Sequence, residues 1–424
     1  MAINPDAKLA PDWNKPDVKK VPTRNGFGEG LAIAGERDKN VVALCADLTE
    51  STRVQLFAEK FPERFIQIGV AEQNMATVAS GLAAVGKIPF IASYAMFSPG
   101  RNWEQIRTTI AYNDRNVKIA AAHSGISVGP DGATHQALED IAIMRVMPNM
   151  ICLVPCDAIE ARKITLAAAE HLGPVYFRFA REKTPVFTTD DTPFEIGKAV
   201  VFRQGNDVAI IACGPLVYEA LIAAEQLAKE GIDCTVINSP SIKPLDGATI
   251  IGAATRCGAV VTAEEAQSGA GLGGSVCELL SEVAPVPIKR VGVKDRFGES
   301  GEPDELMKKF GLKVPDIIQA AKDAIAMKKS TSARPKMMYL ATLLANPREH
   351  FVLKNGKTLK SGAELKQALP SMDDATYKHH VTKDRNDFAN WIADVYRDTE
   401  TANSIRKAHN KQDIIRIIAQ RLKR

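Results

Sequence analysis

Residues 65–97 read F-I-Q-I-G-V-A-E-Q-N-M-A-T-V-A-S-G-L-A-A-V-G-K-I-P-F-I-A-S-Y-A-M-F, and this stretch decides the fold that the sequence predicts. Phe65–Val70 is short and apolar, as in a buried strand, and Gln73–Val85 has the small apolar residues of a packed helix. Glu72 falls on the turn between them, where open α/β sheets bind ligands and a helix dipole favours an anion. Glu72 is therefore a candidate binding residue, although an isolated Glu here also suits a simple helix cap.

Apolar strands alternate with helices on both sides of this stretch. We predict a first helix at Thr23–Glu36 and strands at Val41–Asp47, Ile88–Ser93, Val117–Ala122, Met150–Val154 and Val175–Phe177. Because these strands are apolar throughout, both faces of their sheet must be covered, which indicates a doubly wound parallel domain.

A second unit of the same kind follows a Pro- and Asp-containing connection at residues 182–205. Its predicted strands are Val208–Cys213, Cys234–Asn238, Ala259–Ala263 and Ile288–Val291, and Leu216–Lys229 is an amphipathic helix. We therefore predict an α/β protein with an N-terminal arm (1–22), two doubly wound domains (23–189 and 190–328) and a small, mostly helical extension (329–424).

Composition fits a globular protein outside the membrane. The chain has 424 residues, of which 45% are hydrophobic and 25% charged. No apolar run is long enough to cross a bilayer, and the first residues lack the core of a signal peptide, so we expect a cytoplasmic protein. Seven cysteines lie mostly in apolar runs, and Cys152 and Cys156 lack a second pair at zinc-ligand spacing, which favours buried reduced thiols.

The extension carries the positive charge. Residues 331–424 contain 18 Lys and Arg against 10 Asp and Glu, whereas the whole chain has a net charge of only +4. Its Asn355-Gly356 pair predicts a hairpin turn, and two or three helices follow, including Asp387–Tyr396 and Asp413–Leu422. Interspersed acids and the lack of an aromatic series argue against nucleic acid, so we interpret the extension as an assembly module.

Two further patterns carry no predicted chemistry. Gly269–Gly274 reads G-A-G-L-G-G, but a nucleotide loop would also need a Walker lysine or a following ribose acid. Adjacent His379 and His380 point in different directions on a helix, so a solvated pair is favoured over a metal site.

Three motifs resemble the pyrimidine-binding half of transketolase. They are G-V-A-E-Q-N-M (69–75), Y-A-M-F (94–97) and H-S-G-I-S-V-G-P-D-G-A-T-H-Q (123–136), and the resemblance runs from about Arg24 to about Ala326. It implies that Glu72 hydrogen-bonds the aminopyrimidine ring of thiamine diphosphate, that Phe97 stacks on this ring beside Tyr94, and that Asp47 lines the cofactor pocket. Where the family often has a further aromatic residue, this sequence has Gly100.

The same resemblance assigns substrate contacts. It places Asp131 and His135 at the hydroxyls of a donor ketose, and it places His123 with Arg24, Ser51 and Arg181 at the substrate phosphate. Arg178 is close enough in sequence to exchange roles with Arg181. Imidazole suits proton transfer at neutral pH, and Arg suits a dianion. Simpler interpretations are an ordinary Asp-Gly turn, histidines bonded to backbone and solvated arginines.

Thiamine enzymes hold magnesium and the diphosphate through a G-D-G motif, which this sequence lacks. The resemblance therefore implies that a separate N-terminal subunit carries the diphosphate and magnesium site, and that two copies of each subunit assemble. The activity it implies is transfer of a two-carbon ketol unit from xylulose 5-phosphate to ribose 5-phosphate or erythrose 4-phosphate, in the pentose phosphate pathway. The alternatives are an enzyme like deoxyxylulose-phosphate synthase, one like the beta subunit of a 2-oxoacid dehydrogenase, and a non-catalytic protein that binds through its basic extension.

Overall fold

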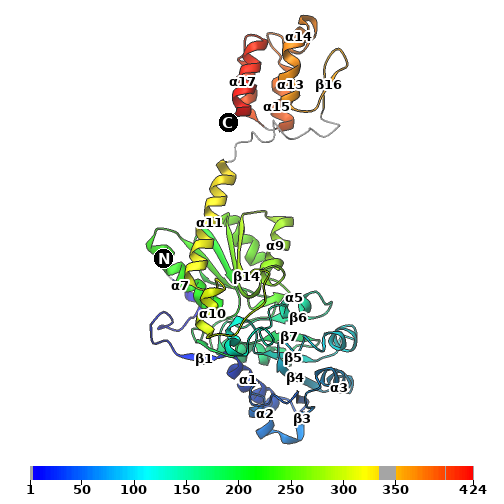
Figure 1. Cartoon of the computed structure of the whole chain (residues 1–424), viewed down its shortest axis with the longest axis vertical. Coiled ribbons are helices and arrows are strands. Elements are labelled where there is room, and N and C mark those ends of the chain that lie inside the picture. The colour runs from blue at the N-terminus through cyan, green and yellow to red at the C-terminus, as the bar shows by residue number, and fades with distance from the viewer. Residues whose placement is uncertain (1–2, 334–349, 397, 424) are drawn as a thin grey trace. The chain divides into compact units, whose positions relative to one another are not determined.

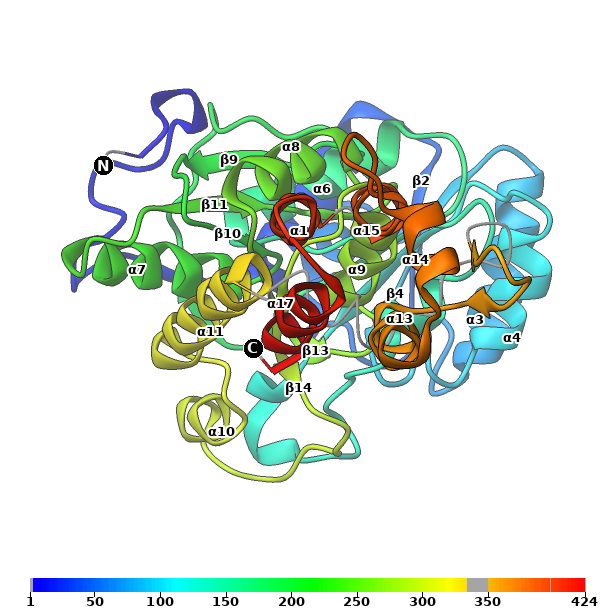
Figure 2. The ribbon, with the colours of Figure 1, turned by 90° about the horizontal axis from the view of Figure 1, so that it is seen from above.

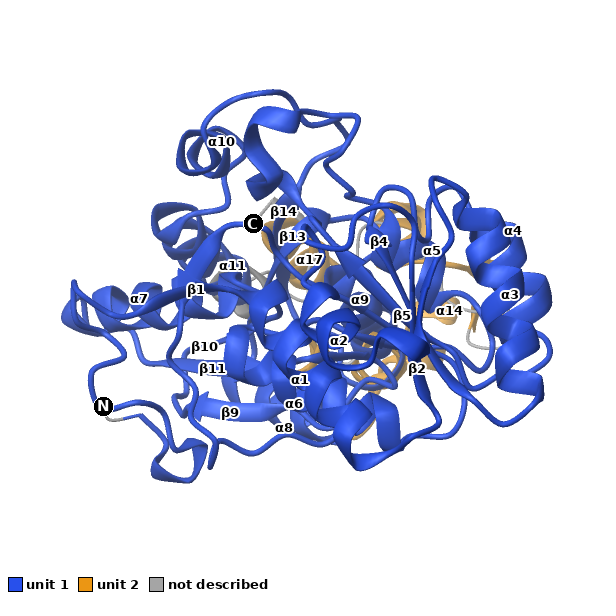
Figure 3. Ribbon diagram, turned by 90° about the horizontal axis from the view of Figure 1, so that it is seen from below, with its two compact units in different colours: residues 1–328 blue, residues 329–424 orange. Residues whose placement is uncertain are grey.

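The structure of the protein is a computed structural model that describes residues 3–333, 350–396 and 398–423 (Figure 1). The chain divides into two compact units, residues 1–328 and 329–424 (Figure 3), and each is described by itself. The first unit contains two α/β sheets, and the predicted fold class is confirmed.

The first sheet has seven strands in the order β12-β6-β7-β5-β4-β2-β3. Its strands are β2 (Val41–Cys45), β3 (Phe65–Gln67), β4 (Ile88–Tyr94), β5 (Lys118–Ala122), β6 (Ile151–Leu153), β7 (Val175–Arg178) and β12 (Ser241–Lys243). All neighbours are parallel except β12 and β6. The helical segments of this domain are α1 (Thr23–Arg37), α2 (Gln55–Lys60), α3 (Glu72–Ala84), α4 (Trp103–Gln105), η3 (Ile106–Ala111), η4 (Ile126–Asp131), α5 (Asp140–Arg145) and α6 (Ala158–Glu170), with the short η2 (Pro62–Arg64) before β3.

Helices cover both faces of this sheet, as its apolar strands require. Val41 and Ala43 of β2 pack with α1, α2 and α6, whereas the alternate residues Val42 and Leu44 pack with α3, η3 and α5. Successive side chains of a strand point to opposite faces, so a strand buried on both sides must be apolar at every position.

The second sheet has the order β14-β13-β10-β11-β9. It consists of β9 (Val200–Arg203), β10 (Val208–Ala212), β11 (Cys234–Asn238), β13 (Val260–Gln267) and β14 (Ile288–Val293), and β9 alone of these pairs antiparallel. Helices α7 (Leu216–Lys229), α10 (Pro303–Lys309) and α11 (Val314–Ala333) pack into one core, and α8 (Gly247–Cys257) and α9 (Leu272–Val283) into another. Figure 2 shows α7 and α11 on one side of the strands.

The two α/β domains share a strand and a hydrophobic core. Strand β12 comes from the second domain but pairs with β6 at the edge of the first sheet, through Ser241 with Leu153 and Lys243 with Cys152. One hydrophobic core also contains residues of both domains, including Met75 of α3 and Val276 of α9. The domains therefore share a buried boundary rather than a flexible joint.

The N-terminal arm is anchored within its own chain. Its β1 (Lys20–Pro22) pairs antiparallel with β8 (Lys183–Pro185), and its short helix η1 (Pro5–Ala7) carries Ala7 into the core of the second domain. Trp13 is buried in the same core and meets Tyr218 edge to face, with ring centroids 6.5 Å apart.

The cysteines and the glycine-rich loop have structural roles. Six cysteines are buried, Cys277 is partly exposed, and all seven are free thiols. Gly269–Gly274 leads into α9, and the backbone N–H groups of Leu272 and Gly273 donate to the carboxylate of Glu264. The anion position at this helix N-terminus is thus filled by the chain itself. No helix among the described residues is long and apolar enough to span a membrane.

The second unit is a small helical domain with a hairpin. It contains β15 (Phe351–Val352), β16 (Thr358–Leu359), α13 (Gly362–Ala368), the short η6 (Leu369–Ser371), α14 (Asp374–His380), α15 (Asp387–Tyr396), α16 (Thr399–Arg406) and α17 (Lys411–Lys423). The predicted turn lies between β15 and β16, where Gly356 has a φ of 82°. In the part of this unit that the structure describes, five α-helices follow the hairpin, whereas two or three were predicted. Residues 334–349, before the hairpin, lie outside the described residues.

The prediction of a solvated histidine pair is wrong for His380. Its ring is buried, and Nδ1 lies 3.2 Å from the Asp387 carboxylate while Nε2 accepts from the backbone N–H of Lys354 at 3.0 Å. His379 is exposed. His380 therefore ties the hairpin to the helices, a role that helix periodicity alone does not reveal.

Candidate active site

Glu72 is the first residue of α3 rather than a turn residue, and its side chain is only 1% exposed. Arg101 Nη1 donates to Glu72 Oε2 at 2.6 Å. The neighbouring Asn102 donates from Nδ2 to the Glu72 carbonyl at 3.1 Å and to Ser98 Oγ at 3.2 Å. The turn after β4 thus holds both the side chain and the backbone of Glu72.

Two aromatic rings lie on the same turn. Tyr94 ends β4, and Phe97 follows it with a ring centroid 6.0 Å away and an interplanar angle of 18°. The Arg101 guanidinium carbon lies 4.9 Å from the centroid of Phe97. The carboxylate of Glu72 and the face of Phe97 are therefore linked through one guanidinium.

Both predicted histidines pack against these rings. His123 follows β5 and stacks on Tyr94 with ring centroids 3.8 Å apart, and the ring of His135 lies edge-on to Phe97 at 5.3 Å. His123 has a φ of 55°, a conformation that few residues other than Gly adopt. Strain of this kind concentrates at functional sites.

Positive charge surrounds His123. Arg24 Nη1 lies 3.4 Å from His123 Nε2 and donates to the backbone carbonyl of Ser51 at 2.8 Å. Burial, followed by Arg24, Arg181 and His135, lowers the pKa of His123 to about 3, so its ring is neutral at pH 7. Burial and then Arg53 and Arg181 also lower the pKa of Arg24.

Some buried polar atoms of this cluster have no partner. In the part of the chain that the structure describes, His123 Nδ1 and Arg24 Nε are buried and make no hydrogen bond. Buried polar atoms are nearly always paired, so unpaired ones call for an explanation. A ligand with acceptor and donor atoms would supply partners for both.

The remaining predicted residues lie on neighbouring loops. Arg181 Nη1 donates to Asp131 Oδ1 at 3.1 Å and to the Val128 carbonyl at 2.9 Å, which ties it to the loop between the two histidines. Asp47 is exposed, has a φ of 59°, and uses its backbone N–H to bond Gln67 Oε1 at 2.8 Å. Among the described residues, neither the Asp47 carboxylate nor the Ser51 hydroxyl makes a hydrogen bond.

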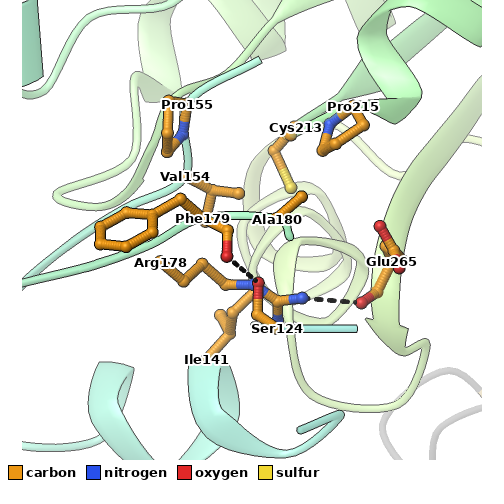
Figure 4. Close-up of a pocket in the computed structure, with 11 residues that line it drawn as sticks. Ser124, Ile141, Val154, Pro155, Arg178, Phe179, Ala180, Cys213, Pro215 and Glu265 are labelled. Atoms are coloured by element: carbon orange, nitrogen blue, oxygen red, sulfur yellow. Dashed lines mark hydrogen bonds between the residues drawn. The ribbon is translucent and has the colours of Figure 1, made fainter. Parts of the chain in front are cut away.

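Arg178 does not belong to this cluster, contrary to the suggested exchange with Arg181. It is fully enclosed between the domains, where it donates to Asp140 Oδ1 at 2.8 Å and to the Glu265 carbonyl at 2.9 Å. Figure 4 shows it in a small pocket lined also by Ser124, Cys213 and Glu265. Asp140 and Glu265 compensate the buried charge, so this guanidinium is not free to bind a substrate.

Sequence reasoning missed Arg101 and Asn102. They follow Glu72 by 29 and 30 residues. Their turn reaches α3 only because β4 lies beside β2, which is the neighbour of β3 in the sheet. The one local signal was their position directly after the aromatic motif.

The cluster fits one half of thiamine diphosphate. The buried carboxylate of Glu72 can accept a hydrogen bond from a ring nitrogen, and the rings of Tyr94 and Phe97 offer an apolar wall to a flat heterocycle. The described residues contain no group of three or more His, Cys, Asp and Glu side chains that could hold a metal ion.

The two sheets place the protein in the class of α/β proteins with two doubly wound domains. Its candidate site lies at the carboxyl ends of parallel strands, where proteins of this class bind ligands. Residues 19–186 match the family "Transketolase, pyrimidine binding domain", and residues 197–317 match "Transketolase, C-terminal domain". The chain belongs to the transketolase family.

Two relatives and one solved structure specify this relationship. The chain is 45% identical to the putative transketolase C-terminal section of Methanocaldococcus jannaschii, over 68% of this chain and 92% of the relative. It is 42% identical to the 6-deoxy-6-sulfo-D-fructose transketolase subunit SqwH of Clostridium sp., over 72% of this chain and 95% of that relative. A structure described as "Split gene transketolase, inactive beta4 tetramer" matches with a TM-score of 0.69 and 45% identity, over 73% of this chain and 99% of that one.

Proposed function

We propose that the chain is the C-terminal subunit of a split, thiamine-diphosphate-dependent transketolase that transfers a two-carbon ketol unit between sugar phosphates. The observation that carries the proposal is the contact chain from buried Glu72 through Arg101 and Phe97 to Tyr94 and His123. It sets a carboxylate, a flat aromatic wall and an imidazole whose Nδ1 has no partner among the described residues at the carboxyl ends of parallel strands.

Thiamine diphosphate, when bound, supplies a carbon nucleophile that can take up the ketol unit. Glu72 would hold a proton at the aminopyrimidine nitrogen, and Phe97 would stack on the face of that ring with Tyr94 beside it. Asp47 lines the rim of the same pocket. Glu72 is kept in position by Arg101 and Asn102, so little reorganisation is needed when the ring arrives.

His123, His135 and Asp131 act on the sugar. Because its pKa is about 3, His123 remains neutral and can accept or donate a hydrogen bond without carrying charge. His135 and Asp131 face the donor hydroxyls and move protons there. Arg24 and Arg181, with Ser51 and His123, bind the phosphate, since guanidinium groups suit tetrahedral dianions.

A separate N-terminal subunit would bind the diphosphate and magnesium. The sequence has no G-D-G motif, and the similar proteins are called a C-terminal section, a transketolase subunit and a split-gene product. In this proposal the cofactor lies between the two kinds of subunit, and self-association gives two copies of each.

Reconstitution tests the proposal. The chain is mixed with the G-D-G-containing transketolase half from the same genome, and turnover is measured with xylulose 5-phosphate and ribose 5-phosphate. We expect transfer by the mixture and none by either part alone, with tight thiamine diphosphate binding in calorimetry only for the mixture. Turnover or tight magnesium-dependent cofactor binding by this chain alone would contradict the division of the site.

The same assay separates the possible substrates. Activity with pyruvate instead of the ketose phosphate would indicate a synthase-like or dehydrogenase-like enzyme. The sulfosugar named for the Clostridium relative is a further donor to test, because a sulfonate is also a tetrahedral anion.

A further inference from the structure

The Glu72 carboxylate is buried, and Arg101 is its one charged partner among the described residues. Its side chain is 1% exposed, and Arg101 Nη1 donates to Oε2 at 2.6 Å. A buried carboxylate without compensation is costly, whereas a charge-assisted hydrogen bond stabilises it. Arg101 therefore decides how this carboxylate is held.

The Arg101 guanidinium also contacts an aromatic ring. It lies over Phe97 at 4.9 Å, and the adjacent Asn102 bonds both the Glu72 carbonyl and Ser98 Oγ. These contacts join residues 98–102 to the first turn of α3. The described residues supply no donor to the other carboxylate oxygen, Oε1, which leaves it available to a ligand.

We propose that Arg101 is a positioning residue of the pyrimidine pocket, a role that rests on the proposed function. By bonding Oε2, it fixes the orientation of the carboxylate and directs Oε1 toward the incoming ring nitrogen. Arg101 remains bound to Glu72 when the ring arrives, because it occupies one oxygen and leaves the second free.

Arg101→Met tests this role, because it removes the charged donor but keeps an apolar stem over Phe97. The measurement is a thiamine diphosphate titration of the reconstituted enzyme, followed by protein fluorescence. A lost charge-assisted hydrogen bond corresponds to about 10-fold weaker binding or more. Arg101→Lys keeps the charge without the planar donor group, and we expect it to recover part of the affinity.

Two controls separate positioning from general stability. Arg107→Met changes an exposed arginine six residues further on and should leave cofactor affinity unchanged. Inorganic pyrophosphate, which resembles only the cofactor tail, should compete equally well in Arg101→Met and wild type, since the tail binds elsewhere. A variant that had merely lost structure would weaken both ligands and lower the unfolding temperature.

The outcomes are distinct. Wild-type affinity in Arg101→Met would overturn the positioning role, and tighter binding would show instead that the guanidinium competes with the ring. Glu72→Gln in the same titration tests the underlying function: if it keeps wild-type affinity, or if the wild-type enzyme binds no cofactor, the proposed function itself fails. Weak binding by Glu72→Gln with normal binding by Arg101→Met rejects only the role of Arg101.

Discussion

Glu72 and Glu264 are two buried carboxylates in two similar domains, yet their surroundings differ. Each lies beside the N-terminus of a helix that packs on a parallel sheet. Glu264 uses both oxygens on its own chain, accepting from the N–H groups of Leu272 at 2.8 Å and Gly273 at 2.7 Å. Glu72 has one oxygen bonded to a guanidinium whose side chain is 46% exposed.

This difference teaches that the doubly wound fold does not by itself create a site. The helix N-terminus next to Glu264 is already neutralised by protein, and burial raises the pKa of that carboxyl to about 7. Around Glu72, the carboxylate oxygen Oε1, an aromatic face and the unpaired atoms of His123 and Arg24 are available to a ligand. Function depends on which polar groups the fold leaves unsatisfied.

The largest expected difference between the two acids concerns turnover. Glu72→Gln keeps the shape of the side chain but removes the group that holds a proton at the ring, so kcat should fall by about 10²–10⁴-fold. The unfolding temperature should stay close to wild type. Steady-state kinetics of the reconstituted enzyme measure the loss. A normal kcat in Glu72→Gln would show that this carboxylate, like that of Glu264, has no part in turnover.

Glu264→Ala should show the opposite pattern. It leaves two buried N–H groups at the start of α9 without an acceptor, which we expect to lower the free energy of unfolding by about 2–4 kcal/mol. The kcat of the folded fraction should not change. Guanidinium denaturation measures the first effect, and reduced kcat at full folding would place Glu264 in the chemistry instead.

Arg181→Met should affect only phosphorylated substrates. Loss of a charge-assisted hydrogen bond of about 1.5–3 kcal/mol corresponds to an increase in KM of about 10–100-fold. The KM of an unphosphorylated donor should change little. Arg37→Met, at an exposed position on α1, is the matched control. Equal effects on both donors would argue against a phosphate contact.

Stability at acid pH gives a smaller contrast. The folded pKa of His123, about 3, is below the unfolded value of about 6.5, so unfolding takes up a proton between these values. The stability that neutral His123 contributes is complete above about pH 6.5 and falls by about 2 kcal/mol at pH 5. Between pH 7 and pH 5, the free energy of unfolding of His123→Gln should therefore fall by about 2 kcal/mol less than that of the wild type. Urea unfolding at the two pH values measures this difference. The control His409→Gln, at an exposed position, should behave as the wild type.

Glu264 should respond to pH in the opposite direction. Its folded pKa is raised to about 7, above the unfolded value of about 4.3, so its contribution to stability is complete below pH 4.3 and is lost as the pH rises through 7. The same urea titrations of Glu264→Gln measure this trend. If the contributions of His123 and Glu264 to the free energy of unfolding changed with pH in the same direction, the prediction would be contradicted.

The smallest effect is expected from removing the second unit. Deletion of residues 334–424 keeps α11 (Val314–Ala333) whole and removes a domain with its own hydrophobic core. We expect kcat/KM of the reconstituted enzyme to remain within about 2-fold of wild type, because the predicted site residues all lie in the first unit. A large loss of kcat/KM would show that the extension contributes to catalysis.

Local patterns predicted much of the fold and less of the site. Continuous apolar runs located β2, β5 and β10 to within a few residues, and the predicted helix at Asp387–Tyr396 is confirmed at both ends. Strand β12 was missed because Ser241–Lys243 is short and is a strand only through pairing with β6. Arg101 was missed because its contact with Glu72 depends on strand order, which periodicity does not contain.

The roles of the predicted site residues remain predictions, but their placement follows from the chain. Glu72, Tyr94 and His123 each lie at or just beyond the end of β3, β4 or β5, and parallel strands bring such ends together. Which of their atoms would be left unpaired depends on side-chain packing and was not visible in the sequence.

The return of β12 to the first sheet limits where a gene of this kind can be divided. A break near residue 190 would separate the first sheet from its edge strand and open a core that both domains share, so neither fragment would keep a closed interior. Fusion and fission events in such genes should accordingly spare this junction, and a fragment ending there should require its other half to remain folded.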